Sequence, residues 1–112
     1  MGVIHLVRAT ATPQQLQEML STLETYIKLA VDVQRRVVAG GGALHADCEA
    51  VLLEDGSQQS DVWGADWIPD SREVRFESLI NIRAAQGNRS MTITDSALRA
   101  AIEAIVRERL QR

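Results

Sequence analysis

Two runs of alternating side chains, residues 61–68 and 73–82, flank a short turn-forming segment. In the first run, Trp63, Ala65 and Trp67 fall on one side, because successive residues of a strand point to opposite faces. The second run places a further, mostly apolar set on one side: Val74, Phe76, Ser78, Ile80 and Ile82. The segment between them consists of turn formers: Pro69, Asp70, Ser71 and Arg72. The pattern predicts an antiparallel hairpin, and therefore a sheet on which helices must pack.

The N-terminal part of the chain predicts a strand followed by a helix. Residues 3–8 are β-branched and apolar, which suits a short buried strand. Thr12 then stands as an N-cap, Pro13 occupies the first helical position, and Gln15 completes a capping box. Apolar residues follow on one helical stripe: Leu16, Met19, Leu20 and Leu23. We predict a helix from residue 13 to about residue 25.

Residues 27–38 allow two interpretations. Apolar residues alternate with polar or small ones, which favours a strand ended by the glycines at 40–42: Ile27, Leu29, Val31 and Val33. The alternative extends the first helix through Val38, because a 3.6-residue repeat also fits several apolar positions: Leu23, Ile27, Ala30 and Val31. We prefer one strand over residues 27–38.

Two interpretations also remain for the acidic stretch LHADCEAVLLEDGS. A strand would place His45, Asp47 and Glu49 together on one face. A helix keeps only His45 and Glu49 as neighbours and buries an apolar stripe: Leu44, Cys48, Val51 and Leu52. Gly56 suits the position just beyond a helix, whereas a two-residue hairpin there would pair leucines with glutamines. We prefer a helix over residues 43–55.

The C-terminal segment predicts a further helix. Thr94 stands as its N-cap, and Ile93 and Leu98 occupy the positions of a hydrophobic staple across that cap. Asp95 suits the positive end of this helix and Arg107 its negative end. The buried stripe follows at helical spacing: Leu98, Ile102, Ile105 and Val106.

The predicted element order is β-α-β-α-β-β-α, in one domain that spans residues 1–112. The fold class is α+β, with an about four-stranded, mixed sheet and about three helices. Trp63 and Trp67 share one strand face and are expected in the core. If no helix covered that face, it would be an exposed apolar patch of the kind that marks a subunit interface.

Charge and apolar run lengths limit the partners and the compartment. The chain has a formal charge of -3 and a pI near 5.3, without the basic stripe that binds a phosphate backbone, so we do not expect nucleic-acid binding. No run approaches the roughly 20 apolar residues of a membrane span, and the N-terminal run is too short for a signal peptide. Cys48, the only cysteine, cannot form an intramolecular disulfide, and neighbouring acids should raise the pKa of its thiol. We expect a soluble, cytoplasmic protein without a membrane partner.

Hydrogen-bond donors gather in one predicted loop, around Gly87: Asn81, Arg83, Asn88, Arg89 and Ser90. Arginine, amide and hydroxyl donors suit the phosphate or carboxylate group of a small anionic ligand. On a strand, Asn81 and Arg83 would point away from the apolar face, toward solvent or a site. In the other interpretation Asn88 and Gly87 form a turn, and the arginines pair with structural carboxylates such as Asp32, Glu49 or Asp66.

His45, Asp47 and Glu49 are candidate metal ligands, because histidine and carboxylates bind divalent ions when they share a side. A catalytic metal needs at least three protein ligands, and the helical interpretation brings only two of these together. A third group would come from elsewhere in the chain: Asp32, Asp61, Asp66 or His5. The competing interpretation is an acidic, solvated helix face. These residues identify no cofactor.

A resemblance to a family is carried by two segments, LHADCEAVLLEDGSQQSDVWGADW and SLINIRAAQGNRSM. Together LHAD, LLEDGS, WGA and INIR make the chain resemble small bacterial proteins of unknown function, found in photosynthetic bacteria among others. The resemblance runs from about residue 3 to about residue 110. In that family INIR is usually followed by a proline, where this chain has Ala84, which loosens the turn but removes no functional group. The resemblance implies a bacterial single-domain protein and brings no reaction, ligand or site residue.

Two functions follow from these features. The small size, the lack of a complete catalytic set and the apolar hairpin favour a non-enzymatic binding or interaction module, acting as a homodimer or in a larger assembly. The alternative is a small enzyme or ligand-binding protein that holds an anionic group through Arg83, Asn88 and Arg89. Its acid–base or metal residues would come from a second set: Asp32, His45, Asp47 and Glu49.

Overall fold

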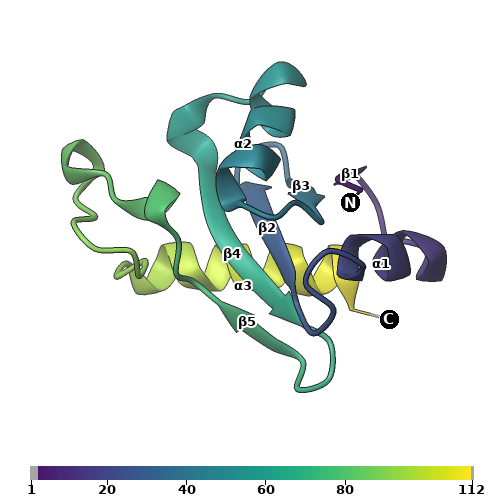
Figure 1. Cartoon of the computed structure of the whole chain (residues 1–112). Coiled ribbons are helices and arrows are strands. Elements are labelled where there is room, and N and C mark those ends of the chain that lie inside the picture. Colours follow the sequence, from purple (N-terminus) through teal and green to yellow (C-terminus); the bar gives the residue numbers. More distant parts are fainter. Residues whose placement is uncertain (1–2, 112) are drawn as a thin grey trace.

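In the computed structural model, which describes residues 3–111, five strands form one sheet in the order β1-β3-β2-β4-β5 (Figure 1). The strands are β1 (His5–Val7), β2 (Ile27–Asp32), β3 (Val37–Gly40), β4 (Val62–Ile68) and β5 (Glu73–Arg75). The helices are α1 (Pro13–Leu20), α2 (His45–Glu54) and α3 (Ser96–Leu110), with short 3-10 helices η1 (Gln59–Asp61), η2 (Leu79–Asn81) and η3 (Ala84–Gln86). The predicted α+β class is confirmed. The described sheet has five strands instead of about four, and it is antiparallel throughout instead of mixed.

The two faces of the sheet carry separate apolar clusters, because alternate strand residues point to opposite sides. Helices α1 and α3 cover one face, and α2 packs on the other through Cys48 and Leu52 (Figure 1). Trp63 and Trp67 lie in the α1–α3 cluster and are 4% and 3% exposed, so their predicted place in the core is confirmed. The tryptophan face is therefore covered within the chain.

The single strand predicted over residues 27–38 is wrong, because the chain reverses direction inside it. Asp32 is fully buried, and its Oδ1 accepts hydrogen bonds from the backbone N–H groups of Gln34 and Arg35, both at 2.9 Å. Arg36 follows with a φ of 56°, and the turn delivers the chain into β3. An aspartate that binds the next backbone N–H groups favours a turn over a continued strand.

Strand β3 was not predicted as a separate strand, and β5 is shorter than predicted. Gly40, expected to end a strand, belongs to β3, where an added Cβ would lie 2.6 Å from Leu29 Cδ2. The hairpin of β4 and β5 is confirmed, but β5 ends at Arg75 instead of continuing to residue 82. Beyond β5 the chain leaves the sheet and forms the irregular segment 76–94.

Helices α1 and α2 form where they are predicted, with shifted ends. The capping box of Thr12 and Gln15 is complete, with both hydrogen bonds present. Helix α1 stops earlier than predicted: Ser21 donates its hydroxyl to the carbonyl of Glu18, and Glu24 adopts a φ of 70°. The acidic stretch forms helix α2 and not the strand of the alternative interpretation. Gly56 lies just beyond this helix with a φ of 108°.

The N-cap predicted for the C-terminal helix is wrong by one residue. Asp95 caps α3, because its Oδ1 accepts hydrogen bonds from the N–H groups of Ala97 and Leu98. Thr94 is engaged elsewhere, since its N–H and hydroxyl both donate to Asn88 Oδ1. A carboxylate at the N-terminus also interacts favourably with the helix dipole.

Candidate functional site

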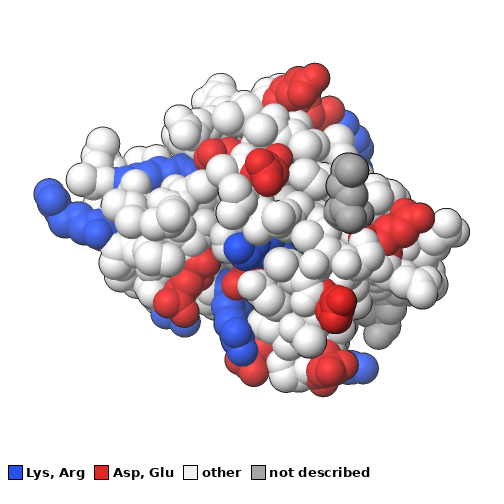
Figure 2. Space-filling view, viewed as in Figure 1, with Lys and Arg blue, Asp and Glu red and all other residues white. Residues whose placement is uncertain are grey.

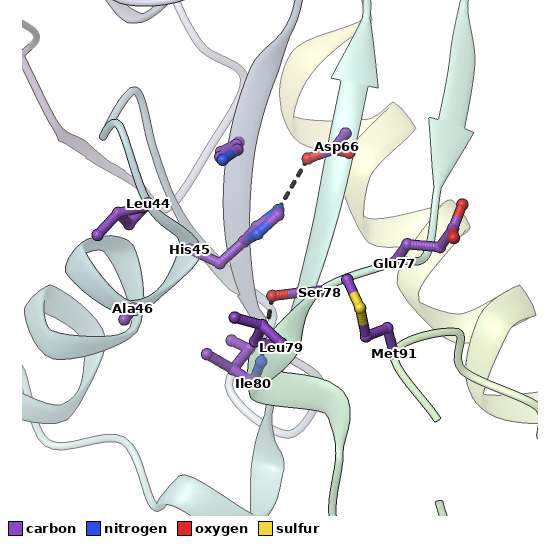
Figure 3. A pocket seen from close by; sticks show the side chains of 10 residues that line it. Leu44, His45, Ala46, Asp66, Glu77, Ser78, Leu79, Ile80 and Met91 are labelled. Atoms are coloured by element: carbon purple, nitrogen blue, oxygen red, sulfur yellow. Dashed lines mark hydrogen bonds and ion pairs between the residues drawn. The ribbon is translucent and has the colours of Figure 1, made fainter. Parts of the chain in front are cut away.

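A pocket forms where α2 leaves part of its sheet face uncovered. Next to the N-terminus of α2, the same face is covered by segment 78–81, which lies directly on Gly64 of β4. An added Cβ at Gly64 would be 2.6 Å from Ser78 Cβ. Between α2 and this segment, Lys28 of β2 and Asp66 of β4 line the cavity, opposite one another in the strand register. Figure 3 shows Asp66 on β4, joined to His45. The pocket thus has a polar floor supplied by the sheet.

The walls of this pocket, which has a volume of about 360 Å³, are mostly apolar. The apolar lining residues are Leu44, Ala46, Leu79, Ile80 and Met91, and the polar ones are Lys28, His45, Asp66, Glu77 and Ser78. Leu44, Leu79 and Met91 are 57%, 72% and 43% exposed. Three large apolar side chains around one cavity are therefore exposed to solvent. Ligand pockets in proteins have this make-up of apolar walls with a few polar groups.

His45, at the start of α2, is fixed by two acceptors. Its Nε2 lies 2.8 Å from Asp66 Oδ1 and 3.1 Å from the carbonyl oxygen of Ala65. A carbonyl oxygen only accepts, so Nε2 carries the proton and donates. In the neutral ring Nδ1 is then an acceptor, and within residues 3–111 it has no hydrogen-bond partner.

The charges around the pocket are unevenly paired. Lys28 donates its Nζ to the carbonyl oxygen of Ala43 at 3.1 Å and forms no ion pair with a described carboxylate. Asp66 is 9% exposed, and His45 is the side chain that pairs with it. Glu77 also lines the pocket and is exposed. Two carboxylates and one lysine therefore line the cavity.

Arg83, the central residue of the predicted anion site, lies elsewhere, and each of its five N–H groups already has an acceptor. The acceptors are the carbonyl oxygens of Gln59, Val62 and Ile80, Gln86 Oε1, and Glu49 Oε2 at 3.5 Å. Its guanidinium carbon lies 4.4 Å from the ring centre of Trp63. Burial lowers the pKa of Arg83, and the nearby Glu49 carboxylate opposes that shift. Arg83 therefore pairs with the carboxylate of Glu49, as in the second interpretation of this loop.

A second hollow contains Arg83 and Glu49 and shares Leu79 and Ile80 with the pocket. Arg83 therefore does not converge with His45, because these two apolar residues stand between the hollow and the pocket. The other members of the predicted anion site are dispersed along segment 76–94.

Three of those members bind the backbone of their own segment. Asn81 is fully buried against Gly64, and Asn88 donates its Nδ2 to the carbonyl oxygens of Asn81 and Ser90, at 2.7 and 2.9 Å. The Ser90 hydroxyl donates to the carbonyl oxygen of Thr92 at 2.8 Å. Arg89 is exposed, and its guanidinium has no acceptor in the described part of the chain. Most of these donors thus shape the loop.

The structure does not gather the predicted metal ligands. His45 faces Asp66, Glu49 pairs with Arg83, and Asp47 is exposed on α2. Across residues 3–111 there is no group of three or more histidine, cysteine or acidic residues that could hold a metal ion. Asp32, the further acid–base candidate, is engaged in the β2–β3 turn and accepts from the Ser57 hydroxyl at 2.6 Å.

Cys48 should resist alkylation. Burial raises the pKa of its thiol to about 11, with a smaller contribution from Asp47, and the side chain is fully buried between α2 and the sheet. At pH 8 the thiolate should be about a hundredfold rarer than for an exposed cysteine. We expect iodoacetamide to leave the folded chain unmodified under conditions that alkylate the chain in 6 M guanidinium. Equal modification with and without denaturant would contradict this prediction.

A small α+β domain with an open, mostly apolar pocket is the class that the fold and the site define. A family model described as protein of unknown function (DUF5674) matches residues 5–109, and the chain belongs to this family. The predicted resemblance to a family of unknown function is thereby confirmed. No curated protein and no solved structure matches the chain. None of the helices within residues 3–111 is long and apolar enough to cross a membrane.

Proposed function

We propose that the protein is a non-enzymatic binding module that takes a small, partly apolar ligand into the pocket between α2 and η2. The observation that carries the proposal is the convergence of Leu44, Leu79 and Met91, all well exposed, on one cavity. Exposed apolar side chains scattered singly need no explanation, whereas a cluster around a hollow marks a binding surface. Binding of a ligand should be favourable because it removes these three side chains from water.

The shape of the site supports a small ligand over a flat protein surface. A volume of about 360 Å³ lies within the range of ligand pockets, roughly 300–1,000 Å³. Asp66 lies on the sheet side and His45 at the start of α2, and apolar residues next to α2 and in segment 79–91 form the walls (Figure 3). A ligand with an apolar body and one polar end matches this division.

Replacing Leu79 with serine should weaken binding of n-hexanol about tenfold, because the change removes the most exposed apolar wall residue. The measurement is an amide chemical-shift titration of the full chain. Hexanol should perturb the amides of residues 44–46 and 77–80. The matched control is Leu53→Ser, an exposed leucine on α2 that does not line the pocket, and its affinity should stay within about twofold of the unsubstituted chain. Equal losses in both variants would contradict the proposal.

A second candidate function rests on the geometry of His45. Asp66 and the Ala65 carbonyl fix its Nε2–H, which leaves Nδ1 as the basic nitrogen of a residue that lines the pocket. A histidine oriented by a carboxylate is the usual arrangement of a general base. In this second candidate function the protein is a small enzyme, and a bound compound should be converted into a product. New ligand resonances during the titration would favour it, and an unchanged ligand spectrum favours the binding module.

Homo-oligomerisation, a cytoplasmic location and anion binding remain proposals. Because α3 already covers the tryptophan face, the exposed rim of Leu44, Leu79 and Met91 is the surface that we propose for contact with a second copy. An anion at Arg83 would have to displace an existing acceptor, which leaves Arg89 as the readier donor. On the face seen in Figure 2, basic side chains are interspersed with acidic ones, which supports the expectation against nucleic-acid binding.

A further inference from the structure

We propose that the pocket selects a ligand whose polar end is a primary ammonium group, held by Asp66 beside His45, with an alkyl or similar apolar body against the leucine wall. The inference rests on the proposed function and adds the chemical class of the ligand. It follows from the pairing of the charged side chains on the pocket floor, from the free acceptor of Asp66, and from the arrangement of the walls.

The first observation is a mostly buried carboxylate without a cationic partner of fixed charge. Asp66 is 9% exposed, and Lys28, opposite to it across the β2–β4 pairing, turns its ammonium to the Ala43 carbonyl. The neutral form of His45 supplies Asp66 with one N–H donor and no charge. A carboxylate with little surface in contact with water is stabilised by a cation or by further donors beside it. A cationic ligand with N–H groups would supply both the positive charge and the donors.

The second observation is unused acceptor capacity. Asp66 Oδ1 accepts from His45, while Oδ2 accepts from no group among residues 3–111 and is accessible to solvent, because no buried side-chain oxygen in that range lacks a partner. Nδ1 of His45 faces away from Asp66, because the two ring nitrogens of an imidazole point in diverging directions, so the free acceptor on the floor is Oδ2. An ammonium group has three donors and no acceptor, whereas a hydroxyl has one donor and a carboxylate has none. Both an ammonium group and a hydroxyl can donate to Oδ2, but only the ammonium group also brings the positive charge that pairs with the Asp66 carboxylate.

The third observation is the placement of the remaining charge and of the apolar walls. Glu77 lines the pocket on the side of segment 77–80, so the carboxylates outnumber the lysine (Figure 3). Leu79 and Met91 stand at the rim of the same cavity, where they would cover an apolar chain. A short alkylammonium ion has a positive charge for the carboxylates and an apolar chain for the walls, so it serves as the probe.

The test compares n-hexylammonium, n-hexanol and n-hexanoate, three probes with the same chain and different ends, by amide chemical-shift titration of the full chain at pH 7.5. We expect n-hexylammonium to bind about tenfold more tightly than n-hexanol, because a charge-assisted hydrogen bond is about twice as strong as a neutral one. n-Hexanoate should bind most weakly. In Asp66→Asn, which keeps an acceptor for His45, the ratio of ammonium to alcohol affinity should fall to within about twofold.

Asp47→Asn is the matched control, because Asp47 is an exposed acid on α2 that does not line the pocket. It changes the net charge equally and should leave the ratio unchanged. Glu77→Gln, at an exposed position, serves if Asp66→Asn does not fold, and it should lower the ratio about twofold.

The outcomes separate this inference from the proposed function. If n-hexanol binds in the pocket but n-hexylammonium binds no more tightly, or if the preference survives in Asp66→Asn, the ammonium inference is overturned and the proposed function stands. Tightest binding of n-hexanoate also overturns it, because Lys28 and the N-terminus of α2 would then hold the polar end. If none of the three probes perturbs residues 44–46 or 77–80, both proposals fail.

Discussion

Replacing Asn81 with leucine should lower the free energy of unfolding by about 3–5 kcal/mol, because several buried backbone groups would lose their partners. Asn81 is fully buried. Its Oδ1 accepts from the N–H of Gly64 at 2.8 Å, and its Nδ2 donates to the carbonyl oxygens of Gly64, Phe76 and Met91. One side chain thus joins β4 to both ends of the loop that forms the pocket wall.

The measurement is urea denaturation followed by the fluorescence of Trp63 and Trp67, which are both in the core. Gln58→Leu is the control, because Gln58 is exposed and its side chain has no hydrogen bond in the described chain. Its effect should stay within about 0.5 kcal/mol. A loss below about 1 kcal/mol for Asn81→Leu would contradict the assigned role of this side chain.

Replacing Arg83 with methionine should lower the free energy of unfolding by a similar amount, about 3–5 kcal/mol. The change leaves a largely buried carboxylate and several acceptors without their partner. The side chains of Arg83 and Glu49 are 11% and 12% exposed, so removal of the guanidinium leaves Glu49 without its ion partner. The carbonyl oxygens of Gln59, Val62 and Ile80 lose a donor as well. The stacking on Trp63 is lost in addition.

Two further variants make this prediction specific. Arg83→Lys should recover less than half of the loss, because one ammonium cannot reproduce five donors in a planar fork. Arg89→Met, at an exposed arginine of the same loop, should change the free energy of unfolding by less than about 0.5 kcal/mol. If Arg83→Met and Arg89→Met had equal effects in urea denaturation, Arg83 would not be the anchor that its contacts indicate.

Local signals explain which parts of the fold the sequence predicts. The capping box of Thr12 and Gln15 involves neighbours along the chain, so the start of α1 is readable from residue types alone. The β4–β5 hairpin is equally local. The reversal after Asp32 is not readable in the same way, because the alternating apolar pattern continues through Val33 and outweighs one turn-forming aspartate.

The candidate site is harder to predict because its parts are distant in sequence. Asp66 is recognisable as a residue on the polar side of a hairpin, but its position opposite Lys28 depends on a strand pairing that no local signal specifies. The donor-rich loop is recognisable by composition, yet Asn81 and Arg83 bind backbone carbonyls, whose positions residue types do not reveal. Gly64 gives a partial signal, since a glycine within a strand often marks close approach of another segment.

The central claim is that ligands bind between the N-terminus of α2 and η2. Intermolecular nuclear Overhauser effects between n-hexylammonium and the protein test it most directly. The chain protons of the probe should show contacts with the methyl groups of Leu79, Ile80 and Met91, which line the pocket. Contacts instead with Leu16, Leu20 and Leu110, which line a different hollow beside Trp67, would contradict the claim.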